Sequence, residues 1–186
     1  MPPSPLPLPD PPLGDDAAGV VLRPWSEDDA GALAAAWADP AVAGVTDVPA
    51  ARTRADARAW IAGDSDRRAA GVALDLVVAG RTDGEVRGEV GLVVRDPVRR
   101  WAEVGFWIGS PYRGAGHATA AVRLITEWAL GPELGLAQVY ARVHRDNESA
   151  GAVLAGAGFE RRGPTEGSHV VWRRRAPDQG GATVRS

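Results

Sequence analysis

The segment from Gly109 to Ala118 has the residue types and spacing that most clearly suggest chemistry. It reads Gly-Ser-Pro-Tyr-Arg-Gly-Ala-Gly-His-Ala and joins an apolar stretch, 101–108, to an amphipathic stretch, 117–130. Its small residues let a ligand approach the backbone closely, and the start of a helix turns several free N–H groups the same way. Such a loop binds phosphate through amide donors and the helix dipole and needs no lysine. The sequence therefore predicts a phosphate-binding loop at Arg113–Ala118.

Missing residue types narrow the remaining chemistry. The chain has no cysteine and no lysine, and its 21 basic residues other than histidine are all arginine. Thiol nucleophiles, thiolate–zinc sites, a Walker-type lysine and a Schiff-base lysine are therefore excluded. The three histidines (His117, His144 and His169) do not have the spacing of a helical metal site, and we expect no metal. Catalysis must rest on carboxylates, histidine, hydroxyls, arginine and backbone groups.

Length and charge indicate one globular domain. The chain has 186 residues, 45% of them hydrophobic, and a net charge of −3. This charge gives no electrostatic reason to expect nucleic acid or an anionic membrane as a partner. No apolar run approaches the roughly 20 residues that span a bilayer, and the N-terminus lacks the pattern of a signal peptide. We expect a soluble, cytoplasmic protein.

Proline content and hydrophobic periodicity predict the organisation of the chain. Residues 2–12 contain seven prolines, so 1–18 is expected to be a disordered tail, 19–175 the folded domain, and 176–186 a second disordered tail. Between the tails the order is β-α-α-β-β-β-α-β-α-β, a mixed α/β fold with helices on the faces of a central sheet. The predicted strands are 20–23, 72–79, 86–95, 101–108, 137–143 and 169–173. The predicted helices are 27–38, 54–61, 117–130 and 149–156.

Strict alternation assigns faces to two of these strands. In 86–95 it places Val86, Val90, Leu92 and Val94 on one face, with Arg87 and Glu89 on the other. In 101–108 it places Trp101, Glu103, Gly105 and Trp107 together, opposite an apolar face.

A dinucleotide-binding reading of the loop fits poorly. A Rossmann fingerprint requires a third glycine where Thr119 stands and an acidic residue at the end of the next strand. That strand, 137–143, ends instead at His144-Arg145. A nucleotide-binding domain unrelated to coenzyme A stays open only as a third reading.

Four segments occur in order around the loop, and together they resemble a known family. They are Trp101-Ala-Glu-Val-Gly-Phe-Trp-Ile-Gly109, Tyr112-Arg-Gly-Ala-Gly-His-Ala-Thr-Ala-Ala121, Ala141-Arg-Val-His-Arg-Asp-Asn147 and Gly158-Phe-Glu-Arg-Arg-Gly163. The chain resembles the GNAT superfamily, specifically the RimJ/RimL-type N-acetyltransferases. The resemblance covers residues 20–175 and is densest from 101 to 163. It implies a GNAT-like acyl-CoA N-acyltransferase fold with acetyl-CoA as co-substrate.

The resemblance also implies roles for individual residues. The loop would hold the pyrophosphate of coenzyme A, and the end of strand 101–108 would pair its backbone with the pantetheine arm. Asn147 would contact the cofactor from the end of the next strand, and Phe159 would lie beside the cofactor cleft or simply in the core. The loop residues are Arg113, Gly114, Ala115, Gly116, His117, Ala118 and Thr119, and the strand-end residues are Trp107, Ile108 and Gly109.

Acyl transfer to an amine needs a neutral amine, donors for the thioester oxyanion and a leaving group. Glu103 is the leading base candidate, because it shares a strand face with Trp107 and could act through a water molecule. The alternative is a structural carboxylate that pairs with Arg87 on the neighbouring strand. Glu89 and His144 are weaker base candidates.

The general acid departs from the family pattern. Many relatives carry a tyrosine four residues before the Gly-Phe pair, where this chain has Leu154. Ser149 is a weak acid candidate, and otherwise the thiolate leaves with help from water alone.

The acceptor side is expected to comprise the first two helices and the loops 45–53 and 163–169. Asp39, Asp47 and Glu166 would make it attractive to a cation such as an ammonium. The acceptor is a protein N-terminus or an amine-bearing small molecule. A non-catalytic acyl-CoA-binding module stays open as the alternative function, and a homodimer through edge strands is compatible with the fold.

Overall fold

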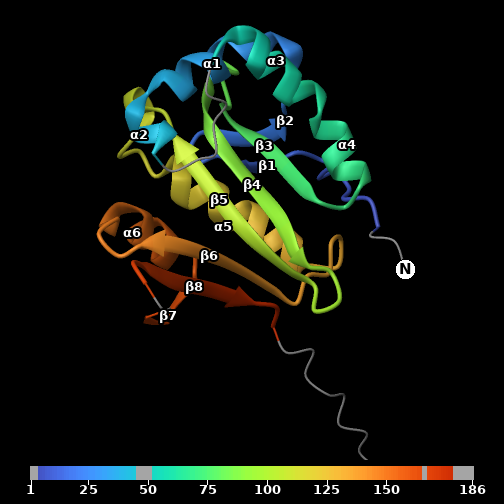
Figure 1. The fold of residues 1–186 in the computed structure, drawn as a ribbon, viewed down its shortest axis with the longest axis vertical. Helices are drawn as coiled ribbons and strands as arrows, with labels where there is room; N and C mark the ends of the chain where they lie inside the picture. Colours follow the sequence, from blue (N-terminus) through green and yellow to red (C-terminus); the bar gives the residue numbers. More distant parts are fainter. Residues whose placement is uncertain (1–3, 45–51, 165–166, 178–186) are drawn as a thin grey trace, which may run out of the picture.

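The computed structural model describes residues 4–44, 52–164 and 167–177, which form one mixed sheet with helices on both faces (Figure 1). The eight strands of these residues lie in the order β1-β2-β3-β4-β5-β6-β8-β7. Their bounds are β1 Leu13–Asp15, β2 Val20–Pro24, β3 Ala73–Gly80, β4 Val86–Asp96, β5 Trp101–Ile108, β6 Gln138–His144, β7 Glu160–Pro164 and β8 His169–Arg175. The helices are η1 Glu27–Asp29, α1 Ala30–Ala38, α2 Pro40–Ala43, α3 Arg54–Ala62, α4 Asp64–Ala69, η2 Ser110–Tyr112, α5 His117–Leu130 and α6 Glu148–Gly156. The expected fold class, a mixed α/β sheet flanked by helices, is confirmed.

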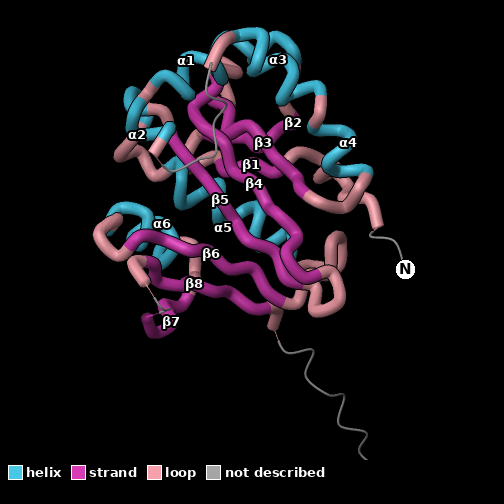
Figure 2. Tube along the Cα trace, in the orientation of Figure 1, coloured by secondary structure: helices cyan, strands magenta, loops and turns pink. Residues whose placement is uncertain are grey.

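The connections divide the sheet into two antiparallel parts. Each adjacent pair of strands from β1 to β5 is antiparallel, and so is each adjacent pair among β6, β8 and β7. Among the described strands only β5 and β6 are parallel, because α5 connects them by a crossover behind the sheet in the view of Figures 1 and 2. The candidate site lies at this parallel junction.

Two hydrophobic cores cover the two faces of the sheet. The larger core packs α5 and α6 against one face, with Leu76, Leu92 and Ile125 among its fully buried side chains. The smaller core packs α1 and α3 against the other face and contains Trp25, Trp37, Trp60 and Trp107, four of the seven tryptophans of the chain. We call this second surface the acceptor face, because α1 and α3 are the first two long helices, which the sequence analysis expects on the acceptor side.

A β-bulge in β4 overturns one predicted face assignment. The pairing of β3 with β4 shifts register after Val78↔Gly88, so that Ala79 lies opposite Val86. The extra residue is Arg87, and it reverses the alternation. Val86 therefore packs into the acceptor-face core, whereas Val90 and Leu92 belong to the larger core as expected.

The N-terminal segment differs from the sequence expectation, which placed a disordered tail before residue 19. Residues Leu13–Asp15 form β1 and pair with β2. Leu6 is only 6% exposed within the larger core, and its amide donates to the Arg68 carbonyl at 2.9 Å. Proline excludes helix, but an extended edge segment needs few amide donors, so a proline-rich chain can still lie against a sheet. Of the predicted C-terminal tail, 178–186 lie outside the described residues.

We predict that Leu6→Ala lowers the free energy of unfolding by about 2 kcal/mol, because it removes a buried side chain from a packed core. Urea denaturation followed by tryptophan fluorescence measures this change. The control is Val98→Ala at a side chain that is 91% exposed, where a change within about 0.5 kcal/mol is expected. Equal effects of the two substitutions would show that the N-terminal segment does not contribute to the core.

Candidate functional site

The parallel strands β5 and β6 separate soon after they begin to pair. Their register contains only Trp101↔Gln138, Ala102↔Val139 and Glu103↔Tyr140. Beyond Glu103, β5 continues to pair with β4 as far as Ile108. Among the described residues, the β6-facing backbone of 104–108 therefore has no strand partner. Trp107, Ile108 and Gly109, the residues expected at the cofactor arm, lie along this open edge.

The loop after β5 has the conformation that close approach to a ligand requires. Gly114 and Gly116 both have φ of 80°, and a Cβ atom at either position would meet no atom within 4 Å. Residues 113–116 are exposed. The first amides of α5 lack intrahelical acceptors, and the N-cap residue Gly116 has no side chain that could bond them. The loop therefore offers free amides at a helix N-terminus, which suits an anion.

Side chains of this loop serve mainly to hold it in place. Arg113 Nε donates to the Ile108 carbonyl at 2.8 Å. His117 is buried, with its Nε2 atom 3.1 Å from Arg87 Nη1. Burial and the guanidinium of Arg87 lower the pKa of His117, so the neutral ring can accept from Arg87. The His117 side chain is therefore occupied within the protein, and its backbone is the part that a ligand could reach.

Asn147 and Ser149 meet at the start of α6. The Asn147 side chain caps the helix by accepting from the Ala150 amide at 3.1 Å. Ser149 is exposed, and its Oγ donates to Asn147 Oδ1 at 2.9 Å. Leu154 is completely buried in the larger core, so the position that carries tyrosine in many relatives holds no proton donor.

Glu103 lies on the acceptor face where β5 and β6 begin to separate, but it is held by two arginines. Arg95 Nε donates to one carboxylate oxygen at 2.9 Å, and Arg142 Nε donates to the other at 2.9 Å. The alternative partner considered from the sequence, Arg87, is wrong, because Glu103 lies opposite Val93 in the register, whereas Arg87 lies at the other end of the pairing beside His117. Tyr140 lies opposite Glu103, and burial together with the Glu103 charge raises the pKa of its phenol.

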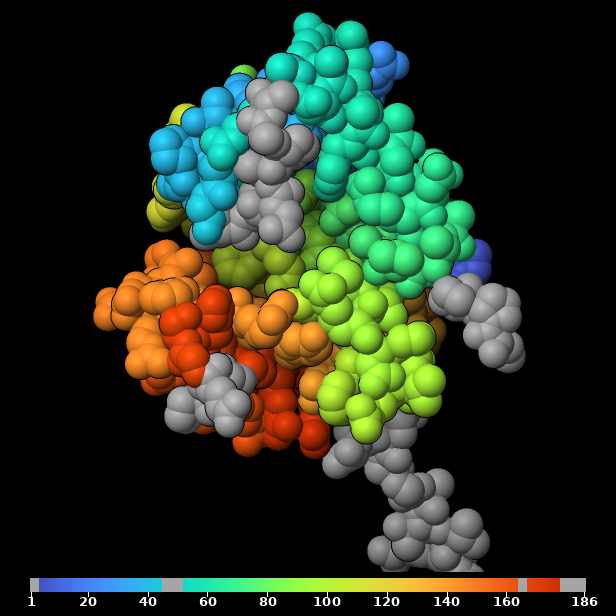
Figure 3. Space-filling model, viewed as in Figure 1, coloured from blue at the N-terminus to red at the C-terminus, as the bar shows by residue number. Residues whose placement is uncertain are grey.

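Gly105 leaves a hollow beside Glu103. Gly91 of β4 lies directly opposite Gly105 of β5. A Cβ at Gly105 would meet nothing within 4 Å, and Gly105 is exposed. Figure 3 shows this part of the sheet at the bottom of a depression between the helices α1–α4 and the segment β6–β8. The hollow adjoins the open edge of β5, with Glu103 and Trp107 on either side of it along the strand.

A second group of carboxylates lies on the same face. Glu89 is opposite Trp107 in the register of β4 and β5. Burial and the nearby charge of Asp75 raise the pKa of Glu89 to about 8, against smaller opposing effects of the Trp107 and Trp25 indoles. Burial raises the pKa of Asp75 to about 6, although Arg67 Nη2 lies 3.3 Å from its Oδ2. The sequence named Glu89 only as a weaker candidate, and it missed Asp75 and Arg67 because no local motif marks them.

The acidic residues expected to attract an acceptor have a different role or lie outside the described residues. Asp39 accepts from Ser110 Oγ at 2.5 Å, and its Oδ2 is 4.0 Å from Arg113 Nη2. The Ser110 hydrogen bond is the main cause that lowers the pKa of Asp39. Asp39 therefore connects the start of α2 to the loop after β5. Asp47 and Glu166 lie outside the described residues.

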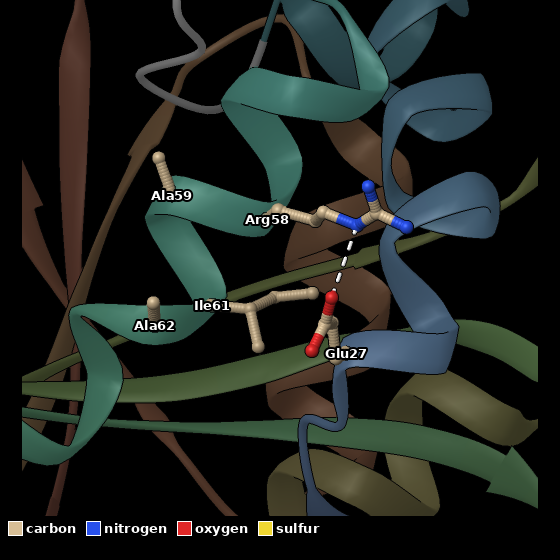
Figure 4. A pocket seen from close by; sticks show the side chains of 5 residues that line it. All are labelled: Glu27, Arg58, Ala59, Ile61 and Ala62. Atoms are coloured by element: carbon tan, nitrogen blue, oxygen red, sulfur yellow. Dashed lines mark ion pairs between the residues drawn. The ribbon is translucent and has the colours of Figure 1, made fainter.

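Two surface pockets lie apart from the hollow over Gly105. One lies between η1 and α3 and contains the ion pair of Arg58 with Glu27, at 3.3 Å (Figure 4). Both side chains of that pair are more than half exposed, and the other residues that line the pocket are alanines and an isoleucine, which supply no acyl-transfer chemistry. The other pocket is basic and is lined by Arg145, Arg161, Arg162, Gly163, His169 and Val170.

The described residues contain no helix that is long and apolar enough to cross a membrane. Within 4–44, 52–164 and 167–177 there is also no group of three or more side chains of the ligating types placed to hold a metal ion.

Comparison with known proteins agrees with this geometry. The family model described as Acetyltransferase (GNAT) domain matches residues 20–160. YdaF of Bacillus subtilis (strain 168), named as a candidate ribosomal N-acetyltransferase, is 38% identical over 77 residues. That match spans 41% of this chain and 42% of YdaF, so it covers less than half of the relative.

Solved structures share the fold over most of the chain. Mycobacterium smegmatis RimJ, in complex with CoA-disulfide, aligns with a TM-score of 0.76 at 24% identity, covering 91% of this chain and 88% of RimJ. Ribosomal-protein-S5-alanine acetyltransferase from Vibrio fischeri aligns with a TM-score of 0.75 at 20% identity, covering 86% and 94%. The resemblance drawn from the sequence motifs is confirmed at the level of family and fold.

We predict that Glu89→Gln changes stability in a pH-dependent way. The pKa of Glu89 lies above its unfolded value, so its stabilising effect is complete below pH 4.5 and is lost as pH rises through about 8. Glutamine does not titrate, so the melting temperature of the variant minus that of the wild type should increase from pH 5 to pH 9. Glu133→Gln, at an exposed carboxylate, should give a flat difference. A flat difference for Glu89→Gln as well would contradict the raised pKa.

Proposed function

The chain belongs to the GNAT acetyltransferase family, and on that premise we propose that it transfers the acetyl group of acetyl-CoA to the α-amine of a protein or peptide N-terminus. The observation that carries this proposal is the separation of β5 from β6 next to an exposed, glycine-containing loop at a helix N-terminus. A long ligand with a phosphate group at one end fits that combination. The hollow over Gly105 adjoins the same edge and gives an amine a place to approach.

The residues present suit coenzyme A. In the proposal, the backbone of Arg113 to Thr119 binds the pyrophosphate, because free amides and the α5 dipole favour an anion. Trp107, Ile108 and Gly109 supply backbone groups to the pantetheine arm along the open edge of β5. Asn147 contributes its side-chain amide, since only its oxygen is used in capping α6. The bound co-substrate supplies the thioester that the amine attacks.

An α-amine is favoured over other acceptors for a chemical reason. Its pKa is near 8, whereas that of a lysine amine is near 10.4, so an α-amine is neutral more often and needs less help from a base. The relatives support the same choice, since RimJ and the S5-alanine acetyltransferase of Vibrio fischeri are similar to this chain in fold. A small amine or drug is the second candidate acceptor.

The leaving group needs little help. A thiol with a pKa near 8.5 leaves as a thiolate that water can protonate. The protein supplies position and oxyanion donors, which account for most of the rate enhancement in such reactions.

The acceptor proposal is tested by thiol release from acetyl-CoA with peptides that begin with alanine or serine. The same peptides with a blocked N-terminus and an internal lysine serve as the matched controls, beside a panel of small amines. We expect turnover with free α-amines and at least tenfold less with the blocked peptides. Binding of acetyl-CoA without thiol release for any amine would favour the non-catalytic acyl-CoA-binding module instead.

Cofactor binding is tested by Gly116→Trp, which should abolish acetyl-CoA binding in calorimetric titration because the indole would fill the space in front of the loop amides. Gly84→Trp is the matched control. Gly84 also has positive φ, 71°, and a Cβ atom there would meet nothing within 4 Å, but it lies in the β3–β4 turn. Equal affinity of both variants would refute the loop as the phosphate site.

We also predict that Ser149→Ala lowers kcat by less than tenfold, because the exposed Ser149 hydroxyl already donates to Asn147 and the thiolate can leave unaided. Steady-state kinetics at saturating acetyl-CoA measure the effect. A loss above a hundredfold would establish Ser149 as the general acid.

A further inference from the structure

The proposed reaction requires a group that removes a proton from the acceptor ammonium, and Glu89 occupies a suitable position. It lies on β4 directly opposite Trp107, which begins the proposed pantetheine edge. Directly opposite cross-strand neighbours on one face have Cβ atoms about 5 Å apart, and diagonal neighbours about 7 Å apart. Glu89 is thus a diagonal neighbour of Gly105, over which the hollow opens.

The surroundings of Glu89 include the buried indole of Trp25. Trp25 is 8% exposed, and its Nε1 atom makes no hydrogen bond of ordinary geometry with any described residue. It nevertheless lies close enough to Glu89 to favour the ionised carboxylate, as does the Trp107 indole. Both indoles thus favour the negative form that a base requires.

A second carboxylate stands next to Glu89. Asp75 lies on β3 opposite Gly91, and a Cβ at Gly91 would be 2.4 Å from Asp75 Oδ1. The glycine thus leaves the space that Asp75 fills. Arg67 of α4 holds Asp75 at 3.3 Å and also lies 3.7 Å from Asp64. Asp75 and Arg67 are therefore the charged groups that face Glu89 from β3 and α4, and the like charge of Asp75 makes Glu89 more basic.

Glu103 has the opposite environment. Both of its oxygens accept from guanidinium groups, those of Arg95 and Arg142. Each carboxylate oxygen of Glu103 is thus already engaged by a guanidinium group. Glu103 is suited instead to holding the side chains of Arg95 and Arg142 at the point where β5 and β6 separate.

We propose that Glu89 is the catalytic base that takes the proton from the acceptor ammonium, with Asp75 as the positioning residue that keeps Glu89 basic. This inference rests on the proposed function. One ammonium proton passes to the Glu89 carboxylate, and the freed nitrogen lone pair forms the C–N bond to the thioester carbon. The C–S bond breaks, the thiolate of coenzyme A leaves with its electron pair and takes the second proton from nitrogen, and Glu89 returns its proton to solvent.

The proposal makes the acceptor class more specific. A carboxyl group with a pKa of about 8 matches an α-ammonium, whose pKa is also near 8, so proton transfer between them is nearly balanced. A lysine ammonium near 10.4 would oppose the same transfer by more than two pKa units. Glu89 therefore selects α-amines.

The test is the pH dependence of kcat at saturating peptide and acetyl-CoA for the wild type, Glu89→Gln, Asp75→Asn and Glu103→Gln. In the wild type, kcat should rise with pH to a plateau. Glu89→Gln should lower the plateau by about a hundredfold or more and remove the rise. Asp75→Asn should move the midpoint to lower pH, because it removes the like charge. A substitution that only disturbs the structure would not shift that midpoint. The free peptide titrates identically with every variant, so its own titration does not explain a shift.

The outcomes separate this inference from the proposed function. No turnover by wild-type protein with any amine refutes the proposed function itself. Turnover with an unchanged profile in Glu89→Gln, or loss of the rise in Glu103→Gln instead, overturns the role of Glu89. If Glu89→Gln does not fold, as judged by its melting curve, Asp75→Asn decides the question, since an unmoved midpoint overturns the proposal.

Discussion

Two neighbouring parallel strands that share only three residue pairs are the constraint on which the rest of this structure depends. Strand backbones carry N–H and C=O groups that must find partners, so an interior sheet edge that opens is costly unless a ligand or water satisfies it. The fold accepts this opening because β5 remains paired with β4 along its whole length and β6 remains paired with β8. Each strand is held on its outer side while the inner sides separate. The gap is thus a stable feature of the sheet.

Helix α5 places its N-terminus beside the opening between β5 and β6. Its apolar side, including Val122, Ile125 and Ala129, is buried in the larger core, which fixes the helix N-terminus beside the end of β5. Positive φ at Gly114 and Gly116 lets the chain turn from strand to helix without a side chain over the amides. The bonds of Asp39 to Ser110 and towards Arg113 tie this loop to the start of α2. Through Asp39, the loop is therefore connected to the helices of the acceptor face.

Electrostatics divide the acceptor face into two carboxylate environments. Glu103 is neutralised by arginines at the edge of the sheet, whereas Glu89 lies among indole rings with Asp75 as its charged neighbour. The same functional group thus has two different surroundings on one face of the sheet. Burial and the nearby charge of Asp75 raise the pKa of Glu89, whereas the oxygens of Glu103 accept from two guanidinium groups.

The sequence by itself determined the family, the mixed sheet, the loop at Arg113–Ala118 and most elements of the core, because each rests on local periodicity or on residues adjacent in the chain. It also ruled out thiol and lysine chemistry, since those residues are absent. Tertiary structure decided the rest. The bulge at Arg87, the pairing of Gly91 with Gly105, the arginines around Glu103 and the charge interaction of Asp75 with Glu89 all involve residues from different strands or helices. Strand register sets these contacts, and register depends on turns, bulges and packing that a single strand's pattern does not contain. The N-terminal segment shows the same limit, since its proline content excluded a helix but only the exposed edge of β2 and the core site for Leu6 gave it a place.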